Sequence, residues 1–285
     1  MGAYNGNPAN IDTIAAGTSL WRVHWTSSTY SPNAFNRSNI APWVDARTLD
    51  TRTTAIPVQG RFEPVHDPAV CLDGAALGGY LYLGLSVGAV VAEGILRGQD
   101  IPPDLIIRKR LLTGKSLAQL VLDDDVDIAV LDGQRNLIRL GQDASLSACS
   151  WRDYGQTRRT ATDILTNTPA AQGLRYECRH GRNELALMLI DGRTAPALTV
   201  VCSAPLDVDG WARDVVTASL LDDFNLTVGV VGGGSRRGRR GRSSTPGGGA
   251  ERPPGRRWRR CTAGCCRSGR RRASPRRSQR CGCSM

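Results

Sequence analysis

Hydrophobic and polar residues alternate in two segments of the first third of the chain. Residues 18–25 read TSLWRVHW, so one face would carry Leu20, Arg22 and His24, and the other would carry two tryptophans and a valine. Residues 79–83 place tyrosines at alternate positions. A period of two is typical of a strand, because successive side chains point to opposite faces. We therefore predict a strand in each segment.

The second strand leads into an apolar helix that contains one carboxylate. Ser86 is a favourable N-cap, and the apolar stretch continues to Leu96. Glu93 follows Ser86 by seven residues, so two turns bring it to nearly the same face as Ser86 and Ala89. Such a carboxylate either points to solvent or faces a cleft and takes part in chemistry. The pattern alone leaves both interpretations open.

The rest of the pattern predicts a mixture of strands and helices with no regular alternation and no internal repeat. Further strands are expected at residues 105–112, 126–131, 173–179, 185–190, 197–202 and 226–231, and helices at residues 116–122, 151–166 and 209–223. The last helix would be capped by Asp209 and would turn Trp211, Val215 and Leu220 inward. A long loop (26–58) and a linker (66–78) join these elements. They favour one α/β (α+β) domain over residues 18–231, preceded by a loose segment at residues 1–17.

The charge of the chain is concentrated at its C-terminal end. Residues 236–285 hold 17 arginines and one acidic residue, Glu251, whereas the whole chain has a net charge of +11. The remaining residues therefore carry a net charge of −5 and give no reason to expect nucleic-acid binding. Gly, Arg, Ser and Pro dominate residues 232–285, which we call the arginine-rich tail, and this composition is typical of disorder. Its alternative role would be contact with nucleic acid or a membrane surface.

The cysteines and the N-terminus bear on the cellular compartment. The nine cysteines have no paired spacing with a nearby histidine, so the sequence predicts no metal site. His24 and His66 likewise have no partner at ligand spacing. The first 14 residues lack the basic and apolar regions of a signal peptide, and no apolar run reaches the ~18 residues of a membrane span. We expect a cytoplasmic protein with reduced thiols and no membrane partner.

Four short pieces stand in order along the predicted domain: Leu20-Trp21-Arg22, Gly60-Arg61-Phe62, Tyr82-Leu83 followed by Glu93 in an apolar helix, and Gly173-Leu174-Arg175-Tyr176. Together they resemble the RES-domain family, named for an Arg, a Glu and a Ser. Its members include toxins of toxin–antitoxin pairs that degrade NAD by phosphorolysis or hydrolysis. The resemblance covers about residues 18–231. It implies a fold similar to the catalytic core of ADP-ribosyltransferases and an Xre-type antitoxin as partner.

The resemblance also implies roles for individual residues. Arg22 and Arg61 would hold the phosphates of NAD or a phosphate co-substrate, and Tyr82 would stack near the nicotinamide or ribose. Glu93 would stabilise the ribosyl cation. Two further positions are implied. Gln156 occupies the position of a glutamine often seen in a later helix of the family, and Cys178 stands where the family has its serine. NAD is then a substrate, and no resident cofactor is expected.

The residue types suit this chemistry independently of the resemblance. Cleavage of a ribosyl–nicotinamide bond passes through an oxocarbenium-like state, which a fixed carboxylate stabilises in a water-poor site. Nicotinamide leaves as a neutral group, so no strong general acid is needed. The planar guanidinium groups of Arg22 and Arg61 match the geometry of pyrophosphate.

Three hypotheses of different classes remain. The first is an NAD-cleaving enzyme that uses Arg22, Arg61, Tyr82 and Glu93, with either water or phosphate as the acceptor. The second is a protein ADP-ribosyltransferase that uses the same residues. The third is a non-enzymatic binding protein whose arginine-rich tail contacts nucleic acid.

Overall fold

The computed structural model describes residues 2–36, 60–67, 72–97, 99–150, 153–181 and 183–229. The strands of its main sheet are β1 (Ile11–Ile14), β2 (Ser19–Trp25), β5 (Tyr80–Gly84), β7 (Lys115–Leu122), β8 (Val126–Val130), β9 (Gly173–Glu177), β10 (Leu185–Ile190) and β11 (Leu198–Pro205). The helices are α1 (Val87–Gly94), α2 (Gln134–Arg139), α3 (Ser145–Ala148), α4 (Tyr154–Thr166) and α5 (Trp211–Phe224), with short 3-10 turns at Gly74–Leu77 and Lys109–Leu111. Two small sheets pair β3 (His66–Asp67) with β4 (Leu72–Asp73), and β6 (Ile106–Arg108) with β12 (Thr227–Gly229).

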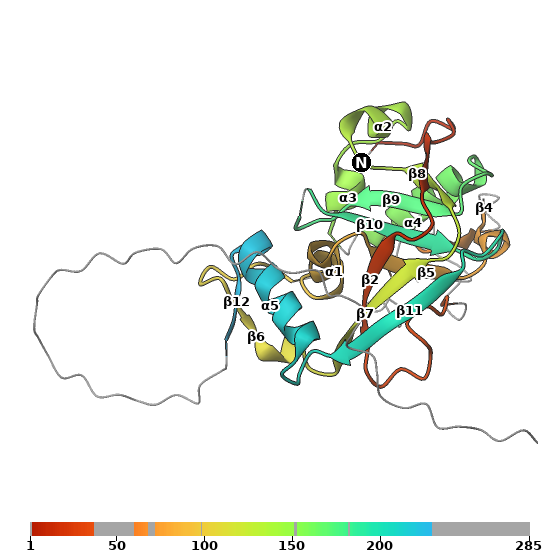
Figure 1. Cartoon of the computed structure of the whole chain (residues 1–285). Coiled ribbons are helices and arrows are strands. Elements are labelled where there is room, and N and C mark those ends of the chain that lie inside the picture. Colours follow the sequence, from red (N-terminus) through yellow and green to blue (C-terminus); the bar gives the residue numbers. More distant parts are fainter. Residues whose placement is uncertain are drawn as a thin grey trace, which may run out of the picture. The chain divides into compact units, whose positions relative to one another are not determined.

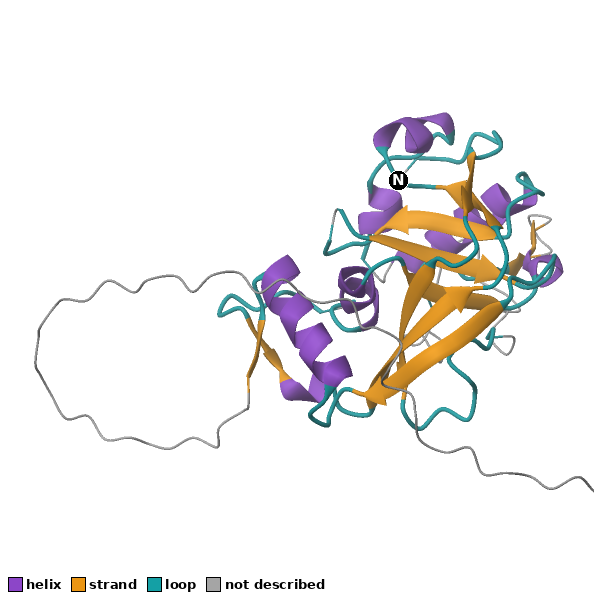
Figure 2. Cartoon of the chain, viewed as in Figure 1, coloured by secondary structure: helices purple, strands orange, loops and turns teal. Residues whose placement is uncertain are grey.

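The main sheet has eight strands in the order β1-β8-β9-β10-β5-β2-β7-β11 (Figure 1). The pair β8/β9 is parallel, and the other neighbouring pairs of this sheet are antiparallel. Strands β2 and β5 share one register pair, Trp21 with Gly84, whereas β2 and β7 pair along the whole of β2. The helices flank the strands of the sheet (Figure 2), and α1, α4 and α5 contact them. The domain is therefore mixed α/β, as the sequence predicted.

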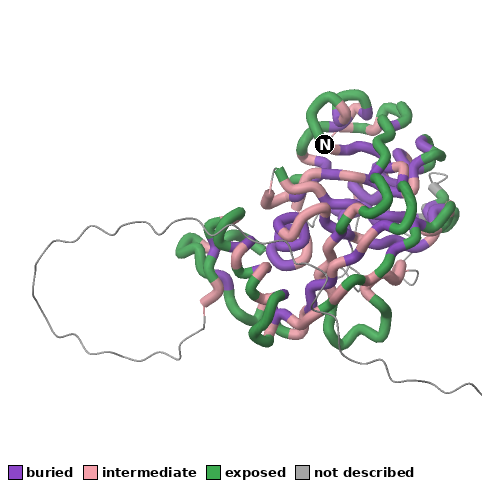
Figure 3. The backbone as a smooth tube through the Cα atoms, in the orientation of Figure 1, coloured by how far each residue is buried: buried purple, intermediate pink, exposed green. Residues whose placement is uncertain are grey.

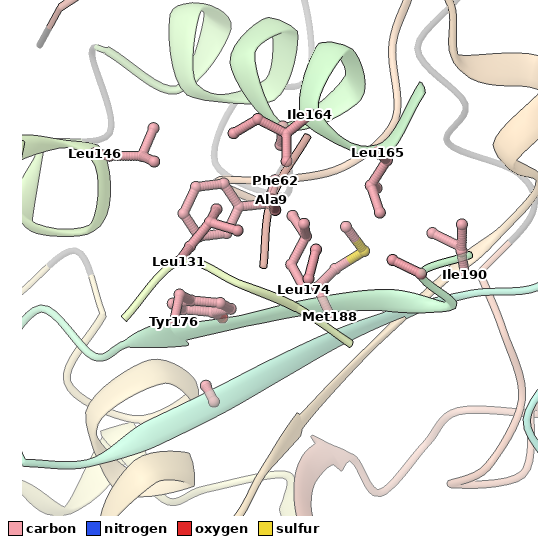
Figure 4. Packing of buried hydrophobic residues seen from close by; sticks show 14 of the residues in the cluster. Ala9, Phe62, Leu131, Leu146, Ile164, Leu165, Leu174, Tyr176, Met188 and Ile190 are labelled. Atoms are coloured by element: carbon pink, nitrogen blue, oxygen red, sulfur yellow. The ribbon is translucent and has the colours of Figure 1, made fainter. Parts of the chain in front are cut away.

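Apolar side chains on the two faces of the sheet form separate parts of the core. Figure 3 shows that buried residues are concentrated along the strands of the sheet. On one face, Phe62 lies between Ile164 of α4 and the β9 residues Leu174 and Tyr176 (Figure 4). The Phe62 and Tyr176 rings meet edge to face, with centroids 4.6 Å apart. A further cluster packs α1 against α5. The segment that contains Phe62 is thereby fixed between α4 and the sheet.

Most predicted elements of the sheet are confirmed, with small shifts at their ends. The strands at 18–25, 79–83, 126–131 and 185–190 appear as β2, β5, β8 and β10, and the strand at 173–179 appears as the shorter β9. The strand at 197–202 is β11, which continues to Pro205. The strand at 226–231 is described as far as Gly229, and the helix at 151–166 is described from residue 153 and appears as α4.

Residues 116–122 form a strand, so the helix predicted there is wrong. This segment belongs to β7, which is hydrogen-bonded to β2 on one side and to β11 on the other. Pairing on both sides outweighs the intrinsic helical preference of its Leu, Ala and Gln residues. The strand predicted at 105–112 is reduced to β6, because a 3-10 turn takes up Lys109–Leu111.

Two further predictions are corrected at the ends of the domain. Residues 11–14 of the segment expected to be loose form β1, because their backbone pairs with β8. Helix α5 begins after Gly210, whereas Asp209 forms an ion pair with Arg213 instead of a cap. Of the three residues predicted to face inward, Leu220 is buried, Val215 is partly buried against the same apolar cluster, and Trp211 is exposed. The arginine-rich tail and residues 37–59 lie outside the described residues, so the predictions for the tail and most of the long loop stay predictions.

Candidate active site

The backbone of residues 60–65 is held by side chains from three directions. The Gly60 N–H donates to a carboxylate oxygen of Glu63, and the Phe62 N–H donates to the Tyr82 hydroxyl at 2.9 Å. A Cβ on residue 60 would lie 2.4 Å from that hydroxyl and 2.5 Å from the Glu63 oxygen. The backbone at Gly60 therefore approaches these side chains too closely for any larger residue. Thr162 of α4 accepts a bond from the Val65 N–H at 3.0 Å.

Arg61 projects from this segment into a ring of aromatic side chains. Its guanidinium carbon lies 5.7 Å from the ring centroid of Phe62, 5.5 Å from that of Tyr154 and 5.9 Å from that of Tyr176. The residue is 1% exposed. Burial opposes its charge, but nearby Glu93 and the tyrosines raise the pKa of the Arg61 guanidinium above its ordinary value. Arg61 is therefore a fixed, permanently charged group inside the protein.

Glu93 is the charged partner of Arg61. The Arg61 Nη1 and a Glu93 carboxylate oxygen are 3.4 Å apart, longer than the about 2.8 Å of a tight charged hydrogen bond. The Glu93 oxygen also accepts from the Arg179 N–H at 3.3 Å, and its side chain is 13% exposed. Ser86 caps α1 as predicted, since its hydroxyl accepts from the Ala89 N–H at 2.9 Å. Glu93 therefore faces other residues of the domain rather than pointing freely into solvent.

Two N–H groups of the Arg61 guanidinium are not used by its ion pair with Glu93. The Arg61 Nε and Nη2 are buried and have no hydrogen-bond partner among the described residues. Buried donors in proteins are nearly always satisfied, and leaving one unmatched costs about 1–3 kcal/mol. The two free donors belong to one planar fork, which matches two oxygens of a carboxylate or phosphate. The Arg61 side of the pair therefore offers donors of the kind that suit an oxygen-rich anion.

A second charged cluster shares Tyr154 with Arg61. The Arg97 guanidinium carbon lies 5.1 Å from the Tyr154 ring centroid, and its Nε is 3.4 Å from the Tyr154 hydroxyl. Glu63 and Arg158 are both buried nearby. Burial raises the pKa of the Glu63 carboxyl, while the Gly60 N–H and the charges of Arg158 and Arg97 oppose that rise. Glu63, which belongs to the segment of residues 60–65 (the Arg61 segment), therefore lies close to the positive charges of Arg97 and Arg158.

Tyr82 lies beside this second cluster. The Arg97 guanidinium carbon is 6.0 Å from its ring centroid. Burial and the nearby Glu63 carboxylate raise the pKa of the Tyr82 hydroxyl well above its ordinary value, so this group stays protonated. Its hydroxyl oxygen accepts the Phe62 N–H, which connects β5 to the Arg61 segment.

Cys178, at the position where the family resemblance implies a serine, contacts helix α1. Its sulfur lies 3.7 Å from the Ala89 carbonyl oxygen, and the residue is 3% exposed. Burial, followed by the negative charge of Glu93, raises the pKa of this thiol. Cys178 is therefore a neutral thiol that lies close to Glu93.

The structure places Arg22 away from this cluster. Trp21 is in register with Gly84, so Gly84 and Tyr82 share the face of Trp21, and Arg22 lies on the other face of the sheet. Its Nη1 donates to the carbonyl oxygens of Pro32 and, at 3.3 Å, Ala34. Burial lowers the pKa of the Arg22 guanidinium to about 10. Its role in anion binding stays a prediction. The arrangement does not favour that role, because Arg22 lies on the other face of the sheet from Tyr82 and donates to backbone carbonyl groups.

Gln156 also lies apart from the residues that surround Arg61. It follows Tyr154 by two residues in α4, and two residues correspond to about 200° around a helix. The side of α4 that carries Tyr154 and Arg158 therefore turns away from Gln156. The structure brings together Glu93, Arg61, Tyr82 and Cys178, and it leaves Gln156 and Arg22 outside their group.

Four side chains near Arg61 were not among the predicted site residues: Glu63, Arg97, Tyr154 and Arg158. Arg97 and Glu63 are close in sequence to Glu93 and Arg61, the residues that had been singled out. Tyr154 and Arg158 belong to the stripe of α4 that faces the core. Charged residues at core-facing positions were the available signal.

Two features are absent from the described residues. They contain no group of three or more His, Cys, Asp or Glu side chains that could hold a metal ion. Within the same part of the chain, no helix combines the length and apolarity that crossing a membrane requires.

Comparisons with known proteins found a likeness in structure but no match in sequence. No protein-family model matches the sequence, and no curated protein matches it. The fold is similar to a chain in the crystal structure of the M. tuberculosis MbcT–MbcA toxin–antitoxin complex. That match has 14% sequence identity and a TM-score of 0.44, and it covers 68% of this chain and 86% of that chain. At this level of similarity, a functional assignment rests on the side-chain geometry described above.

Proposed function

We propose that this protein is a RES-type enzyme that cleaves the ribosyl–nicotinamide bond of NAD. The observation that carries the proposal is the buried pair of Arg61 and Glu93, in which two guanidinium donors have no partner among the described residues. The pair combines an anion-binding fork with a fixed negative charge. A dinucleotide substrate has the matching features, a pyrophosphate and a ribosyl carbon that becomes positive during cleavage.

Arg61 binds the pyrophosphate in this mechanism. Its Nε and Nη2 donate to phosphate oxygens, while its Nη1 stays beside Glu93. The surrounding rings of Phe62, Tyr154 and Tyr176 hold the guanidinium plane in place. Because the fork is preorganised, little side-chain freedom is lost when the substrate binds.

Glu93 stabilises the reacting carbon. The C1′–N1 bond breaks, and its electron pair goes to the pyridinium nitrogen, which leaves as neutral nicotinamide. The positive charge that develops on the ribose is then stabilised by the Glu93 carboxylate. An oxygen of water or of inorganic phosphate forms the new bond to C1′. Tyr82 acts through the backbone of the Arg61 segment, to which its hydroxyl is bonded.

The decisive experiment measures NAD consumption by the purified protein and identifies the products by mass spectrometry, with and without phosphate. Glu93→Gln is expected to fold like the wild type and to lose about 10²–10³-fold in rate. Glu177→Gln is the matched control, because Glu177 is bonded to the Gly133 N–H at 3.2 Å and lies at the end of β9. Equal rates for Glu93→Gln and the wild type would disprove the role of Glu93. Products attached to an added protein acceptor would show ADP-ribosyl transfer instead.

The antitoxin partner implied by the resemblance is part of the same proposal. We expect an Xre-type helix-turn-helix protein to bind the catalytic domain and to suppress NAD loss. Co-expression of a neighbouring gene of that type, followed by co-purification, tests this expectation. An Xre-type protein that leaves NAD loss unchanged and does not co-purify would count against it.

A further inference from the structure

The turn that joins β9 to β10 is fixed against helix α1. The Cys178 N–H donates to the Glu184 carbonyl oxygen at 2.9 Å, and the Glu184 N–H donates to the Gly181 carbonyl oxygen at 2.9 Å. The turn is also tied to α1, since the Arg179 N–H donates to Glu93 at 3.3 Å. The residue after Arg179 is consequently held close to the reacting carboxylate.

That residue is His180, which the mechanism above does not use. Its Nε2 is buried and has no hydrogen-bond partner among the described residues, although the ring as a whole is partly exposed. Glu93 and Arg61 are both close enough to act electrostatically on the ring, as are Arg179 of its own turn and Asp100. A buried ring nitrogen without a protein partner normally meets a water or a ligand.

His180 is neutral at physiological pH in this environment. Burial and the positive charge of Arg179 lower the pKa of the imidazole, Arg61 lowers it further, and the carboxylates of Glu93 and Asp100 oppose the change. A neutral imidazole has one nitrogen that accepts a proton. When Nδ1 carries the hydrogen, the unpartnered Nε2 is that acceptor.

We propose that His180 is the general base that takes a proton from the water molecule attacking the ribosyl carbon. The inference rests on the proposed NAD cleavage and concerns its acceptor. The water oxygen bonds to C1′, the C1′–N1 bond breaks with its electron pair on nicotinamide, and the water proton passes to Nε2. The products are ADP-ribose, nicotinamide and one proton, which His180 later releases to solvent. Phosphate dianion already has a deprotonated oxygen and needs no such base.

The test compares hydrolysis and phosphorolysis in His180→Gln. Purified full-length protein is incubated with NAD alone or with NAD and inorganic phosphate, and the two products are quantified separately. Hydrolysis is expected to fall by about 10²-fold or more, the usual contribution of a general base, while phosphorolysis keeps its wild-type rate. His24→Gln is the matched control, because His24 lies on β2 and is bonded to the Ser203 hydroxyl at 3.1 Å.

Three results would overturn the inference. They are an equal fall of both reactions, no fall of either, and a wild type that forms only the phosphorolysis product. A wild type that does not consume NAD at all would instead disprove the proposed function. If His180→Gln does not fold, the pH profile of wild-type hydrolysis decides the question. The kcat/KM for hydrolysis should fall tenfold per pH unit on the acid side, beginning below about pH 6.5. A flat profile over the whole acid range in which the protein stays folded would exclude His180 as the base.

Discussion

The Thr157 hydroxyl oxygen lies 2.6 Å from the carbonyl oxygen of Arg61 and donates a hydrogen bond to it. Thr157 belongs to α4 and is fully buried. Its bond fixes the peptide group of the residue whose side chain reaches Glu93. Because neighbouring backbone groups are held by Tyr82 and Thr162, the position of the Arg61 guanidinium depends on β5 and α4 together.

Thr157→Val should weaken substrate binding more than it weakens the chemical step. Valine is similar in shape but lacks the hydroxyl, so the Arg61 carbonyl loses its donor at a cost of about 1–3 kcal/mol in unfolding free energy. We also expect a higher KM for NAD, since the guanidinium fork is no longer fixed. Chemical denaturation and steady-state kinetics measure the two effects.

Two variants serve as controls for Thr157→Val. Thr157→Ser should restore the wild-type KM, because it restores the hydroxyl. Thr166→Val applies the same substitution on the same helix, where the hydroxyl bonds only to the Thr162 carbonyl oxygen in the described structure, and should leave KM unchanged. A stability loss in Thr157→Val without any change in KM would show that Thr157 has a purely structural role.

Arg61→Lys keeps the charge beside Glu93 but removes the fork of donors. A lysine cannot reproduce two parallel hydrogen bonds to phosphate oxygens, and it loses part of the planar contact with the three aromatic rings. We expect a higher KM for NAD and a lower kcat. Arg175→Lys is the control, since Arg175 forms its ion pairs with Asp132 and Asp12 outside this site. Unchanged kinetic constants in Arg61→Lys would exclude a phosphate-binding role.

The sequence predicted the local elements of this site well because their signals are local. Tyr82 lies on a strand of alternating pattern, and Glu93 lies on a helix whose N-cap Ser86 is adjacent in sequence. The helix at residues 116–122 failed for the opposite reason. Its strand conformation depends on pairing with β2 and β11, which lie about 100 and 80 residues away along the chain.

The same distinction explains the errors in the predicted site. Arg22 and Tyr82 both lie on predicted strands, but their faces depend on the single register pair between Trp21 and Gly84, which no local pattern encodes. Arg97 and Tyr154 come together only through the packing of α4 against the Arg61 segment. The family resemblance implied roles for Arg61 and Glu93 separately, and their ion pair, like the contacts of Arg97 and Tyr154, appears only in the folded structure.

The arginine-rich tail provides a prediction that rests on sequence alone. A chain ended at Val231 should melt at the same temperature and cleave NAD at the same rate, because residues 232–285 contain few groups able to form a core. It should lose salt-sensitive binding to polyanions, since 17 arginines are removed with the tail. Melting curves, NAD assays and heparin binding at several salt concentrations measure these effects. Failure of the shortened chain to fold would mean that the tail belongs to the structured part of the protein.

The buried thiol of Cys178 predicts how stability changes at alkaline pH. Burial raises the pKa of this thiol in the folded protein, whereas in the unfolded chain it ionises at about pH 8.5. Above that pH the unfolded chain releases a proton that the folded protein keeps, so rising pH favours unfolding. The contribution to the free energy of unfolding falls by up to ~1.4 kcal/mol per pH unit. The stabilising contribution of the Cys178 thiol is therefore fully present below about pH 8 and declines as the pH rises further.

Cys178→Ser should remove this decline without harming the site. A serine hydroxyl does not ionise in this range, and it can donate to the Ala89 carbonyl oxygen that the thiol now contacts. We therefore expect the unfolding free energy of Cys178→Ser, relative to wild type, to increase steadily between pH 8 and pH 10, while NAD cleavage at neutral pH is retained. Urea denaturation at a series of pH values measures the difference. Parallel pH profiles for the two proteins would show that the Cys178 thiol ionises as easily in the folded protein as in the unfolded chain. Burial against α1 would then leave the pKa of this thiol unchanged.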